Sequence, residues 1–406
     1  MVDKFGISKH CGIFDMDILQ TNTMEVIFSG LVLIYVAYWL MMNYYFLKKN
    51  GVEVTKNFNQ DEDKCFCSIV ICARNEEKHI SKCLESIICQ EEIEKYSEII
   101  LVNDASEDNT VIVAESILSR QRIPYKIIHN PVSIGKKKSI EKAVASAHSE
   151  SKYILFRDAD TYTTTNQWFK TISSYLKNDV DLLIAPVIHG HYFDNQHSFL
   201  SKTIFYVQYY EGLALIHLTL SSFKLGRPIL CNGANMAVKR HTFQKINPYA
   251  DNYHIHTGDD IFLLNKIKSE RGTIISAFEK SCVVYTYPPR NINDLLKQKT
   301  RWLSKTTAND DFFNAVSAMV VAMGNLSLLF LVFLSFKWFL ILLITKVSVD
   351  LISIHLVQNR LKLRDSLSIY FFIAELLYIP YVCALIFKLF TQVHKNDGGI
   401  DTTGRA

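Results

Sequence analysis

Blocks of apolar residues divide this chain into two membrane-like ends and a mixed middle. Residues 24–47 carry almost no charge, and three more apolar blocks follow late in the chain, at 312–336, 338–357 and 368–390. Each block approaches or exceeds the roughly 20 residues that a helix needs to cross a bilayer. We therefore expect one N-terminal and three C-terminal transmembrane helices, a soluble domain at residues 50–305, and tails at residues 1–23 and 391–406.

The first block has a second interpretation, which is a signal peptide. It is longer than the apolar region of a signal peptide, which has about 7–15 residues. Asp15 and Asp17 precede it in place of a basic cluster, and no small-residue cleavage site follows it. The pattern favours a membrane anchor.

Basic residues beside the apolar blocks predict the orientation in the membrane, because cytoplasmic loops are enriched in Lys and Arg. One basic group follows the first block and another separates the last two blocks: Lys48, Lys49 and Lys56, then Arg360, Lys362 and Arg364. Both groups predict a cytosolic domain with both tails outside, although Lys337 in the short outer turn argues against it. Asp350 is costly in lipid, so we expect it to face other helices or a polar path.

Within residues 50–305, short apolar runs alternate with amphipathic segments. Four runs are typical of strands, and the first is apolar throughout, as in a strand buried on both faces: Cys65–Ala73, Glu98–Val102, Tyr125–His129 and Tyr153–Phe156. Helical patterns between the runs predict right-handed βαβ units, and therefore an α/β fold with a mainly parallel sheet. We expect Asn75 and Asp108 to cap the helices that follow the first two strands.

Polar side chains follow three of these strands at the points where the strands end. Arg74 and Asn75 follow the first strand, Asp104 the second, and Asp158 with Asp160 the fourth. Ligands bind outside the carboxyl ends of strands in such sheets. These residues therefore predict one shared binding crevice.

The sequence Asp158-Ala159-Asp160 places two carboxylates two residues apart. Mg²⁺ or Mn²⁺ prefers oxygen ligands and often shares them with substrate phosphates. Such a triplet can also merely cap a helix. Its position after a buried strand favours a metal site.

The basic run Gly135-Lys136-Lys137-Lys138-Ser139 suggests a phosphate contact at a helix N-terminus. A phosphate-binding P-loop would need glycine at position 130, where this chain has Asn130. Lys136 or Lys138 could contact a diphosphate, and a solvated basic turn fits equally well.

Two later motifs precede regular elements. Asn232-Gly233-Ala234-Asn235 comes before a strand at Met236–Val238, and its small residues would let a substrate approach the backbone, or form a plain turn. Thr257-Gly258-Asp259-Asp260 opens a helix. Thr257 or Asp259 could serve as a cap, whereas a carboxylate beside a metal–diphosphate site would supply a general base for a hydroxyl group.

Gln298, Arg301 and Trp302 lie just before the second apolar block, on a helix expected to begin near Asn293. Gln298 and Arg301 share a face at this spacing. Arginine can neutralise a departing diphosphate, and tryptophan offers a flat surface for a sugar ring. The alternative is a juxtamembrane anchor, where Trp, Lys and Arg are common.

The remaining features refine these expectations. Phe199–Phe223 is apolar and aromatic with polar interruptions, which predicts a helix either on the membrane surface or in the core. The formal net charge of +4, without aromatic residues among the basic ones, indicates no nucleic-acid surface. The nine cysteines form no C-x-x-C pair and fit a reducing compartment.

Taken together, the ordered motifs resemble the family 2 inverting glycosyltransferases with a GT-A fold. Among these, the chain is similar to the membrane-integrated synthases of the cellulose, chitin, hyaluronan and poly-N-acetylglucosamine type. The resemblance covers roughly residues 65–310 and the membrane layout, and it ends in Gln298-x-x-Arg301-Trp302 just before a span.

The resemblance implies roles on the donor side of the site. Arg74 and Asp104 would hold the nucleoside, Asp158 the nucleotide and its sugar, and Lys138 is the candidate diphosphate contact. Asp160 would bind a Mg²⁺ or Mn²⁺ ion that bridges the diphosphate.

On the acceptor side, the resemblance implies that Asp260 is the catalytic base and that Gln298, Arg301 and Trp302 bind the diphosphate and the terminal sugar. The expected donor is a nucleotide-sugar, in particular a UDP-sugar. The expected partners are a polysaccharide or lipid-linked acceptor, membrane lipids and, as one possibility, an accessory membrane subunit.

The chain departs from the family pattern at Asn103 and Asp259, where Asp and Glu are frequent.

With four spans, the chain could synthesise a polymer processively or transfer a single sugar. Ceramide glucosyltransferase-like enzymes carry a similar final motif and transfer one sugar to a lipid. A third interpretation is a non-catalytic membrane transport or scaffold protein. The intact Asp104, Asp158, Asp160, Asp260 and Arg301 argue against it.

Overall fold

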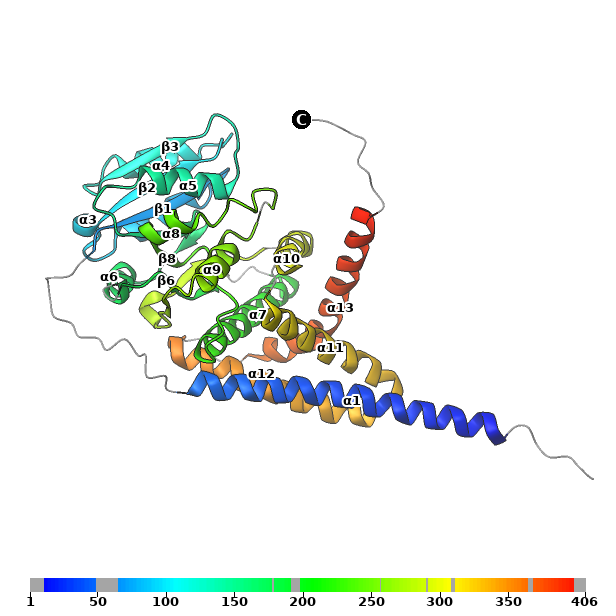
Figure 1. The fold of residues 1–406 in the computed structure, drawn as a ribbon. Helices are drawn as coiled ribbons and strands as arrows, with labels where there is room; N and C mark the ends of the chain where they lie inside the picture. The colour runs from blue at the N-terminus through cyan, green and yellow to red at the C-terminus, as the bar shows by residue number, and fades with distance from the viewer. Residues whose placement is uncertain are drawn as a thin grey trace, which may run out of the picture.

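A computed structural model describes residues 11–48, 65–176, 179–190, 198–255, 257–289, 291–307, 311–363 and 368–397. It shows an α/β domain that rests on a group of long helices (Figure 1). Lys49, Lys56 and Arg364, on which part of the predicted orientation depends, lie outside the described residues, as do residues 1–10 and 398–406.

The domain is built on a seven-stranded sheet with the order β3-β2-β1-β4-β8-β6-β9. The bounds are β1 Cys67–Ala73, β2 Ser97–Asn103, β3 Tyr125–His129, β4 Tyr153–Asp158, β6 Leu182–Ile184, β8 Met236–Lys239 and β9 Ile274–Ser276. All neighbouring pairs are parallel except those of β8, which runs antiparallel to β4 and β6. The predicted α/β fold with a mainly parallel sheet is therefore confirmed, with β8 as the exception.

Helices cover both faces of this sheet. The helices are α2 Ile80–Ile88, α3 Ile93–Tyr96, α4 Thr110–Leu118, α5 Lys136–Ser146, α6 Trp168–Tyr175, α8 Arg240–Ile246 and α9 Asp259–Ser269. Ile69 and Ile71 of β1 pack into a core with α2, α4 and α6, whereas Val70 packs into a second core with α5, α8 and α9. Because successive side chains of a strand point to opposite faces, the continuous apolar run of β1 fills both cores.

Neither of the two predicted residues holds the cap position of its helix. Asn75 adopts a left-handed conformation at φ 57°, and its Oδ1 accepts a hydrogen bond from the Glu107 amide at 2.8 Å, while His79 holds the cap position of α2. The Asn75 prediction is therefore wrong, because this side chain links two loops instead. At α4 the cap position belongs to Asn109, not to Asp108, although the Asp108 carboxylate accepts a hydrogen bond from the Thr110 amide at 3.0 Å.

A small second sheet lies beside the end of β4. Its order is β5-β10-β7, with β5 Thr161–Tyr162, β10 Val284–Thr286 and β7 Val187–His189, and a short 3₁₀ helix, η2, spans Lys280–Cys282. The register pairs Thr286 with Thr161 on one side and with His189 on the other. This sheet therefore brings distant chain segments to the edge where β4 delivers its carboxylates.

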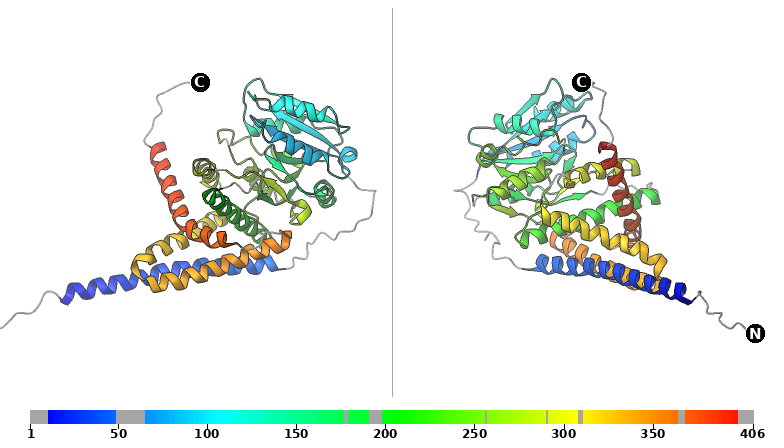
Figure 2. Two further views of the ribbon diagram at one scale, coloured as in Figure 1. Left: turned by 180° about the vertical axis from the view of Figure 1, so that it is seen from behind. Right: turned by 45° about the vertical axis from the view of Figure 1, so that its right-hand side comes forward.

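In the described part of the chain, four helices are long and apolar enough to cross a membrane: Asn22–Leu47 within α1, Phe312–Leu334 (α11), Phe336–Leu361 (α12) and Ile369–Ile386 within α13. α1 itself spans Cys11–Leu47, so it begins inside the segment that the sequence assigns to a tail, and α13 spans Ile369–Asp397. α1 and α12 lie side by side along the base of the molecule (Figures 1 and 2).

Asp350 of α12 faces its neighbouring helices, as predicted. Its carboxylate accepts a hydrogen bond from the Tyr35 hydroxyl of α1 at 2.8 Å and pairs with Lys346 at 2.7 Å. Lys346 also pairs with Glu375 of α13 at 2.5 Å. These contacts link three of the four apolar helices through charges that would be costly if they faced lipid.

α7 spans Phe199–Lys224 and lies between the sheet domain and the long helices, and α10 spans Ile292–Thr307 beside it (Figure 1). Phe205, Tyr209 and Leu213 of α7 are buried in a cluster with residues of α12 and α13. The structure thus favours the core-helix interpretation of this segment.

Candidate active site

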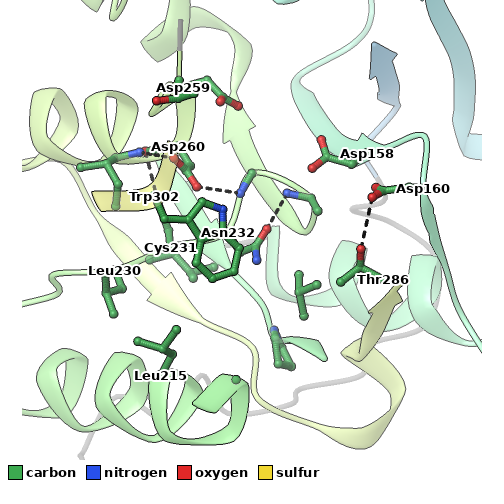
Figure 3. Close-up of a pocket in the computed structure, with 18 of the residues that line it drawn as sticks. Asp158, Asp160, Leu215, Leu230, Cys231, Asn232, Asp259, Asp260, Thr286 and Trp302 are labelled. Carbon is green, nitrogen blue, oxygen red and sulfur yellow. Dashed lines mark hydrogen bonds between the residues drawn. The ribbon is translucent and has the colours of Figure 1, made fainter. Parts of the chain in front are cut away.

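One cavity of about 620 Å³ lies where the carboxyl ends of the parallel strands meet α7, α9 and α10 (Figure 3). It combines groups from distant parts of the chain. Of the nine predicted site residues, seven line it, namely Arg74, Asp158, Asp160, Asp260, Gln298, Arg301 and Trp302. The structure therefore contains a cavity where the sequence predicts a binding crevice.

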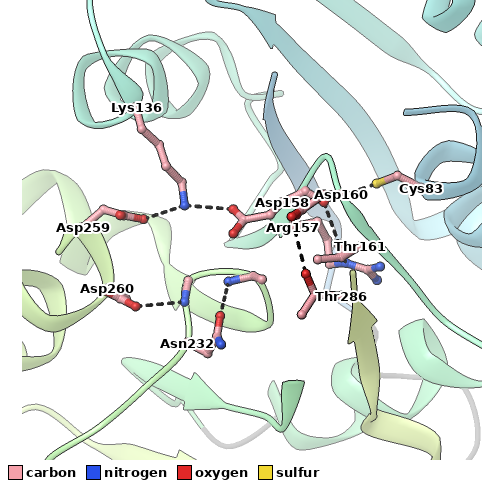
Figure 4. Close-up of polar contacts among 12 residues, drawn as sticks. Cys83, Lys136, Arg157, Asp158, Asp160, Thr161, Asn232, Asp259, Asp260 and Thr286 are labelled. Carbon is pink, nitrogen blue, oxygen red and sulfur yellow. Dashed lines mark hydrogen bonds and ion pairs between the residues drawn. The ribbon is translucent and has the colours of Figure 1, made fainter. Parts of the chain in front are cut away.

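Asp158 and Asp160 both line this cavity, as does Ala159 between them, which also packs into the hydrophobic core. The Thr286 hydroxyl donates to Asp160 Oδ2 at 3.4 Å (Figure 4). Burial, followed by the charges of Asp158 and Glu76, raises the pKa of Asp160 to about 6. The cavity therefore concentrates negative charge that a bound cation would relieve.

The donor set fits a divalent ion that shares its coordination with a substrate. Among the residues that the structure describes, no group of three or more His, Cys, Asp or Glu is placed to hold a metal by itself. Mg²⁺ and similar ions commonly use one or two carboxylates, with substrate phosphates and water as further ligands. Asp158 and Asp160 match that arrangement.

Lys136 lies between two of the predicted motifs. Its ammonium group contacts Asp158 Oδ1 at 2.8 Å and Asp259 Oδ2 at 2.9 Å (Figure 4). Burial disfavours the charged form of Lys136, but the two carboxylates outweigh this effect and raise its pKa. Lys136 is therefore a fixed positive charge that joins the end of β4 to the start of α9.

Lys138, which the sequence suggests as a diphosphate contact, does not line this cavity. Its side chain is exposed, and its ammonium group lies 5.5 Å from the centre of the Tyr253 ring. Because α5 begins at Lys136, a residue two positions later points about 200° away around the helix. Lys136 is the lysine of this run that reaches the site.

Asp259 and Asp260 occupy the first turn of α9, and both are buried. The cap position belongs to Gly258, at φ 85°, so capping by Thr257 or Asp259 is wrong. Asp260 Oδ1 accepts a hydrogen bond from the Ile261 amide at 2.9 Å, and its Oδ2 lies 3.4 Å from the Gly233 amide. The Asp260 carboxylate is thus held by backbone groups at the cavity wall.

The loop before β8 supports this pair of carboxylates. A Cβ atom added at Gly233 would lie 3.0 Å from Asp259 Oδ2 and 3.5 Å from both Asp260 Cβ and Lys136 Nζ. A plain turn would not need this close approach. The loop therefore packs closely against the start of α9.

Asp104 is buried and is not among the residues that line the cavity. Its carboxylate accepts hydrogen bonds from the Ser133 hydroxyl at 2.8 Å, the Ile134 amide at 2.9 Å and the Gly135 amide at 3.1 Å. Burial favours the protonated carboxyl, but these bonds, with one from Asn130, lower the pKa of Asp104. Asp104 fixes the loop that leads into α5, and its contact with a nucleoside stays a prediction.

Arg74 connects that loop to the cavity, because its Nη1 donates to the Ser133 hydroxyl at 2.8 Å. The side chain also lines the cavity. Arg74 and Asp104 therefore both contact the Ser133 hydroxyl.

Gln298, Arg301 and Trp302 of α10 also line the cavity. The side chain of Lys299, which lies between them in the sequence, is buried and forms an ion pair with Glu211 of α7. Its ammonium group lies 4.1 Å from the centre of a Trp302 ring. The predicted anchor role fits Lys299 poorly, because its side chain is only 4% exposed.

Sequence reasoning missed several groups that contribute to this site. Glu76, His189 and Thr286 line the cavity, but each belongs to a short element or loop without a recognisable motif. Glu211 was visible only as a polar interruption of an apolar stretch. Only the fold reveals that these residues meet.

Comparison with known proteins adds to this geometry. Residues 68–246 match the family model for Glycosyl transferase family 2. The chain is 25% identical over 271 residues to a poly-beta-1,6-N-acetyl-D-glucosamine synthase of Staphylococcus epidermidis, covering 65% of this chain and 61% of the relative. It is 27% identical over 161 residues to a dolichyl-phosphate beta-glucosyltransferase of Trichomonas vaginalis, covering 36% of this chain and 46% of that relative. The matches thus span less than two thirds of either relative.

A solved structure supports the fold. A mannosyltransferase from Pyrobaculum calidifontis, in complex with GDP-Man and Mn²⁺, aligns with a TM-score of 0.54 at 12% identity, covering 92% of this chain and 94% of that chain. At this identity the likeness concerns the fold alone, which is the GT-A fold.

Proposed function

Because this chain belongs to the family 2 glycosyltransferases, we propose that it moves a sugar from a nucleotide-sugar, in particular a UDP-sugar, to a growing polysaccharide or glycolipid. The observation that carries this proposal is the arrangement of the cavity. The carboxylates of Asp158 and Asp160 at one wall share the space with Asp260 at the start of α9 and with the Gln298–Trp302 segment of α10.

The proposed reaction is a single displacement that inverts the anomeric centre. Asp260 accepts the proton of the acceptor hydroxyl, whose oxygen bonds to the anomeric carbon while the bond from that carbon to the diphosphate breaks. The backbone contacts of Asp260 hold the carboxylate in place for this role. Trp302 offers its ring face to a sugar.

Positive charge is needed where the diphosphate departs. Asp158 and Asp160 would hold a Mg²⁺ or Mn²⁺ ion, which supplies Lewis-acid stabilisation of the leaving diphosphate when bound. Lys136 and Arg301 line the same cavity and add positive charge from this chain itself. The mannosyltransferase with the related fold was solved with GDP-Man and Mn²⁺, which supports a divalent ion.

We further propose that the domain predicted at residues 50–305 faces the cytosol, beneath one N-terminal and three C-terminal spans. Lys48, Arg360 and Lys362 lie at the ends of the apolar helices nearest this domain. The positive-inside tendency supports this orientation. Labelling of cysteines introduced at residues 15 and 245 in intact and opened membrane vesicles would test it.

A second candidate function is the transfer of one sugar to a lipid acceptor. Leu215 and Leu230 form an apolar part of the cavity wall (Figure 3). Ile216 also lines the cavity and packs in a cluster with residues of α12 and α13. The similarity to a dolichyl-phosphate beta-glucosyltransferase supports this candidate as well. Both candidates share the donor side and the base.

Product size distinguishes the two candidates. The protein in lipid nanodiscs is incubated with Mg²⁺ or Mn²⁺ and a panel of radiolabelled UDP-sugars, with and without lipid extract. A ladder of long products establishes polymer synthesis, and one labelled sugar on a lipid establishes single transfer. Absence of any metal-dependent sugar transfer, under all donors and extracts, would contradict both and favour a non-catalytic role.

A further inference from the structure

Lys136 contacts a carboxylate that a divalent ion would also use. Its ammonium group lies 2.8 Å from Asp158 Oδ1 and 2.9 Å from Asp259 Oδ2 (Figure 4). Asp158 and Asp160 are the carboxylates whose arrangement fits a metal ion that shares its ligands with a substrate phosphate. The ammonium group and a metal ion therefore compete for Asp158.

The backbone of Lys136 is fixed, whereas its side chain can turn. Lys136 is the first residue of α5, and the Asp104 carboxylate accepts hydrogen bonds from the amides of the two residues before it, at 2.9 and 3.1 Å. The Lys136 side chain lines the cavity and is 34% exposed, and the carbon stem of a lysine is flexible. Lys136 can therefore change its partner in the cavity without a movement of the fold.

A diphosphate in the cavity offers Lys136 a different partner. Phosphate oxygens form strong, charge-assisted hydrogen bonds with an ammonium group. When the ammonium group turns to a diphosphate, it leaves the Asp158 carboxylate to a metal ion, which the same diphosphate also attracts. When no diphosphate is present, a metal ion at Asp158 has to displace the ammonium group or lie next to its positive charge.

The two arginines of the cavity are placed differently. Arg74 and Arg301 both line the cavity and add positive charge to it. Arg74 Nη1 donates to the Ser133 hydroxyl at 2.8 Å, and Arg301 belongs to α10. Their charges act on a metal ion equally in the wild type and in a variant of Lys136. The direct pair with Asp158 is what distinguishes Lys136.

We propose that Lys136 makes the binding of a divalent ion at Asp158 and Asp160 depend on the diphosphate of the donor. Without the diphosphate, Lys136 holds Asp158 and lowers the affinity of the two carboxylates for the ion. With the diphosphate, Lys136 releases Asp158 and binds phosphate oxygens instead. This inference rests on the proposed function and deepens it, because it sets the order of binding: the nucleotide enters before the metal ion or together with it.

The test compares two neutral variants, Lys136→Met and Lys136→Gln, with Lys136→Arg, which keeps the charge. Lys138→Met is the matched control, because Lys138 lies on the same helix but is exposed and does not line the cavity. Each full-length protein is placed in phosphatidylcholine nanodiscs, and Mn²⁺ binding is measured by electron paramagnetic resonance with and without saturating UDP. UDP binding in EDTA and thermal unfolding are measured in parallel.

In the absence of UDP, we expect both neutral variants to bind Mn²⁺ about five- to tenfold more tightly than the wild type, the effect of removing one partly exposed charge beside a divalent ion. With UDP present, this gain should fall below about twofold, because Lys136 of the wild type has then left Asp158. In EDTA, UDP should bind both neutral variants about five- to tenfold more weakly, because a charge-assisted hydrogen bond is lost. Lys136→Arg, which still pairs with carboxylate and phosphate, and Lys138→Met should both stay within about twofold of the wild type.

Three results would overturn the inference: neither neutral variant binds Mn²⁺ more tightly without UDP, the gain is as large with UDP as without it, or Lys136→Arg or Lys138→Met shows the same gain. A merely structural role of Lys136 would lower the melting temperature without any gain in Mn²⁺ affinity. Failure of the proposed function looks different. In that case the wild type transfers no sugar from any donor, while Mn²⁺ binding without UDP still decides whether Lys136 competes for Asp158.

Discussion

The close fit of Gly233 against Asp259 and Asp260 makes Gly233→Ala an informative substitution. The added Cβ would lie 3.0 Å from Asp259 Oδ2, whereas ordinary contact begins at 3.4 Å. Gly233 is not among the glycines with positive φ, so alanine fits its backbone. The main consequence is therefore a displacement of the start of α9 by about 0.4 Å, or an equal shift of the loop.

The size of the effect follows from that displacement. A misplacement of about 1 Å at a catalytic group costs about 100-fold in rate, so a shift of about 0.4 Å corresponds to roughly five- to tenfold. The free energy of unfolding should change by less than about 1 kcal/mol, because the lower entropy of the unfolded alanine chain offsets the crowding. The assay is UDP release under saturating donor and acceptor.

Gly212→Ala is the matched control. Gly212 lines the same cavity from α7, but an added Cβ would meet only His189 Cδ2, at an ordinary contact distance of 3.5 Å. We expect unchanged kcat and a gain of about 0.5–1 kcal/mol in stability, since alanine is preferred in helices. Full activity of Gly233→Ala, or an equal loss in Gly212→Ala, would show that the close contact of Gly233 with Asp259 does not position α9 for turnover.

Three further predictions follow from the charges of the site. Lys136→Met should lower the free energy of unfolding by about 1–3 kcal/mol and weaken UDP binding, because Asp158 and Asp259 lose a shared cation. An unchanged melting temperature and UDP affinity would contradict this prediction. The lowered pKa of Asp104 gives stability that is fully present above its unfolded pKa of about 3.9 and is lost as the pH falls through the folded value. Asp104→Asn should therefore flatten the decline in stability below pH 4, and a decline as steep as in the wild type would count against it. Chelation with EDTA should abolish UDP release and Mn²⁺ or Mg²⁺ should restore it, whereas EDTA-resistant turnover would exclude the proposed metal role.

Of the four strands predicted in the first half of the domain, β1, β2 and β4 are buried along nearly their whole length, whereas the edge strand β3 is partly exposed. β1 to β4 are long enough for their apolar runs to be recognised, and they end within two residues of the predicted ends. β5, β7 and β10 span only two or three residues each, and they exist because they pair with one another. Their pairing across distant parts of the chain leaves no local pattern, so Thr286 and His189 were not predicted at the site.

Local sequence patterns were enough to place some of the site residues but not all of them. Motifs placed Asp158, Asp160 and Asp260 correctly at the cavity because strand ends and helix starts are set by local sequence. The choice between Lys136 and Lys138 depended on where α5 begins, and a helix start is uncertain by one or two residues in sequence reasoning. The ion pair of Lys299 with Glu211 joins two helices and needed the fold.

The role of Asp260 as the base is tested most directly by sugar transfer with Asp260→Asn in nanodiscs, measured as UDP release and labelled product. Asparagine keeps the size of the side chain and removes its ability to accept a proton. We expect a loss of about 10²- to 10⁴-fold in kcat, with UDP affinity and melting temperature close to the wild type. Product formation at the wild-type rate in this variant would contradict the assignment of Asp260 as the base.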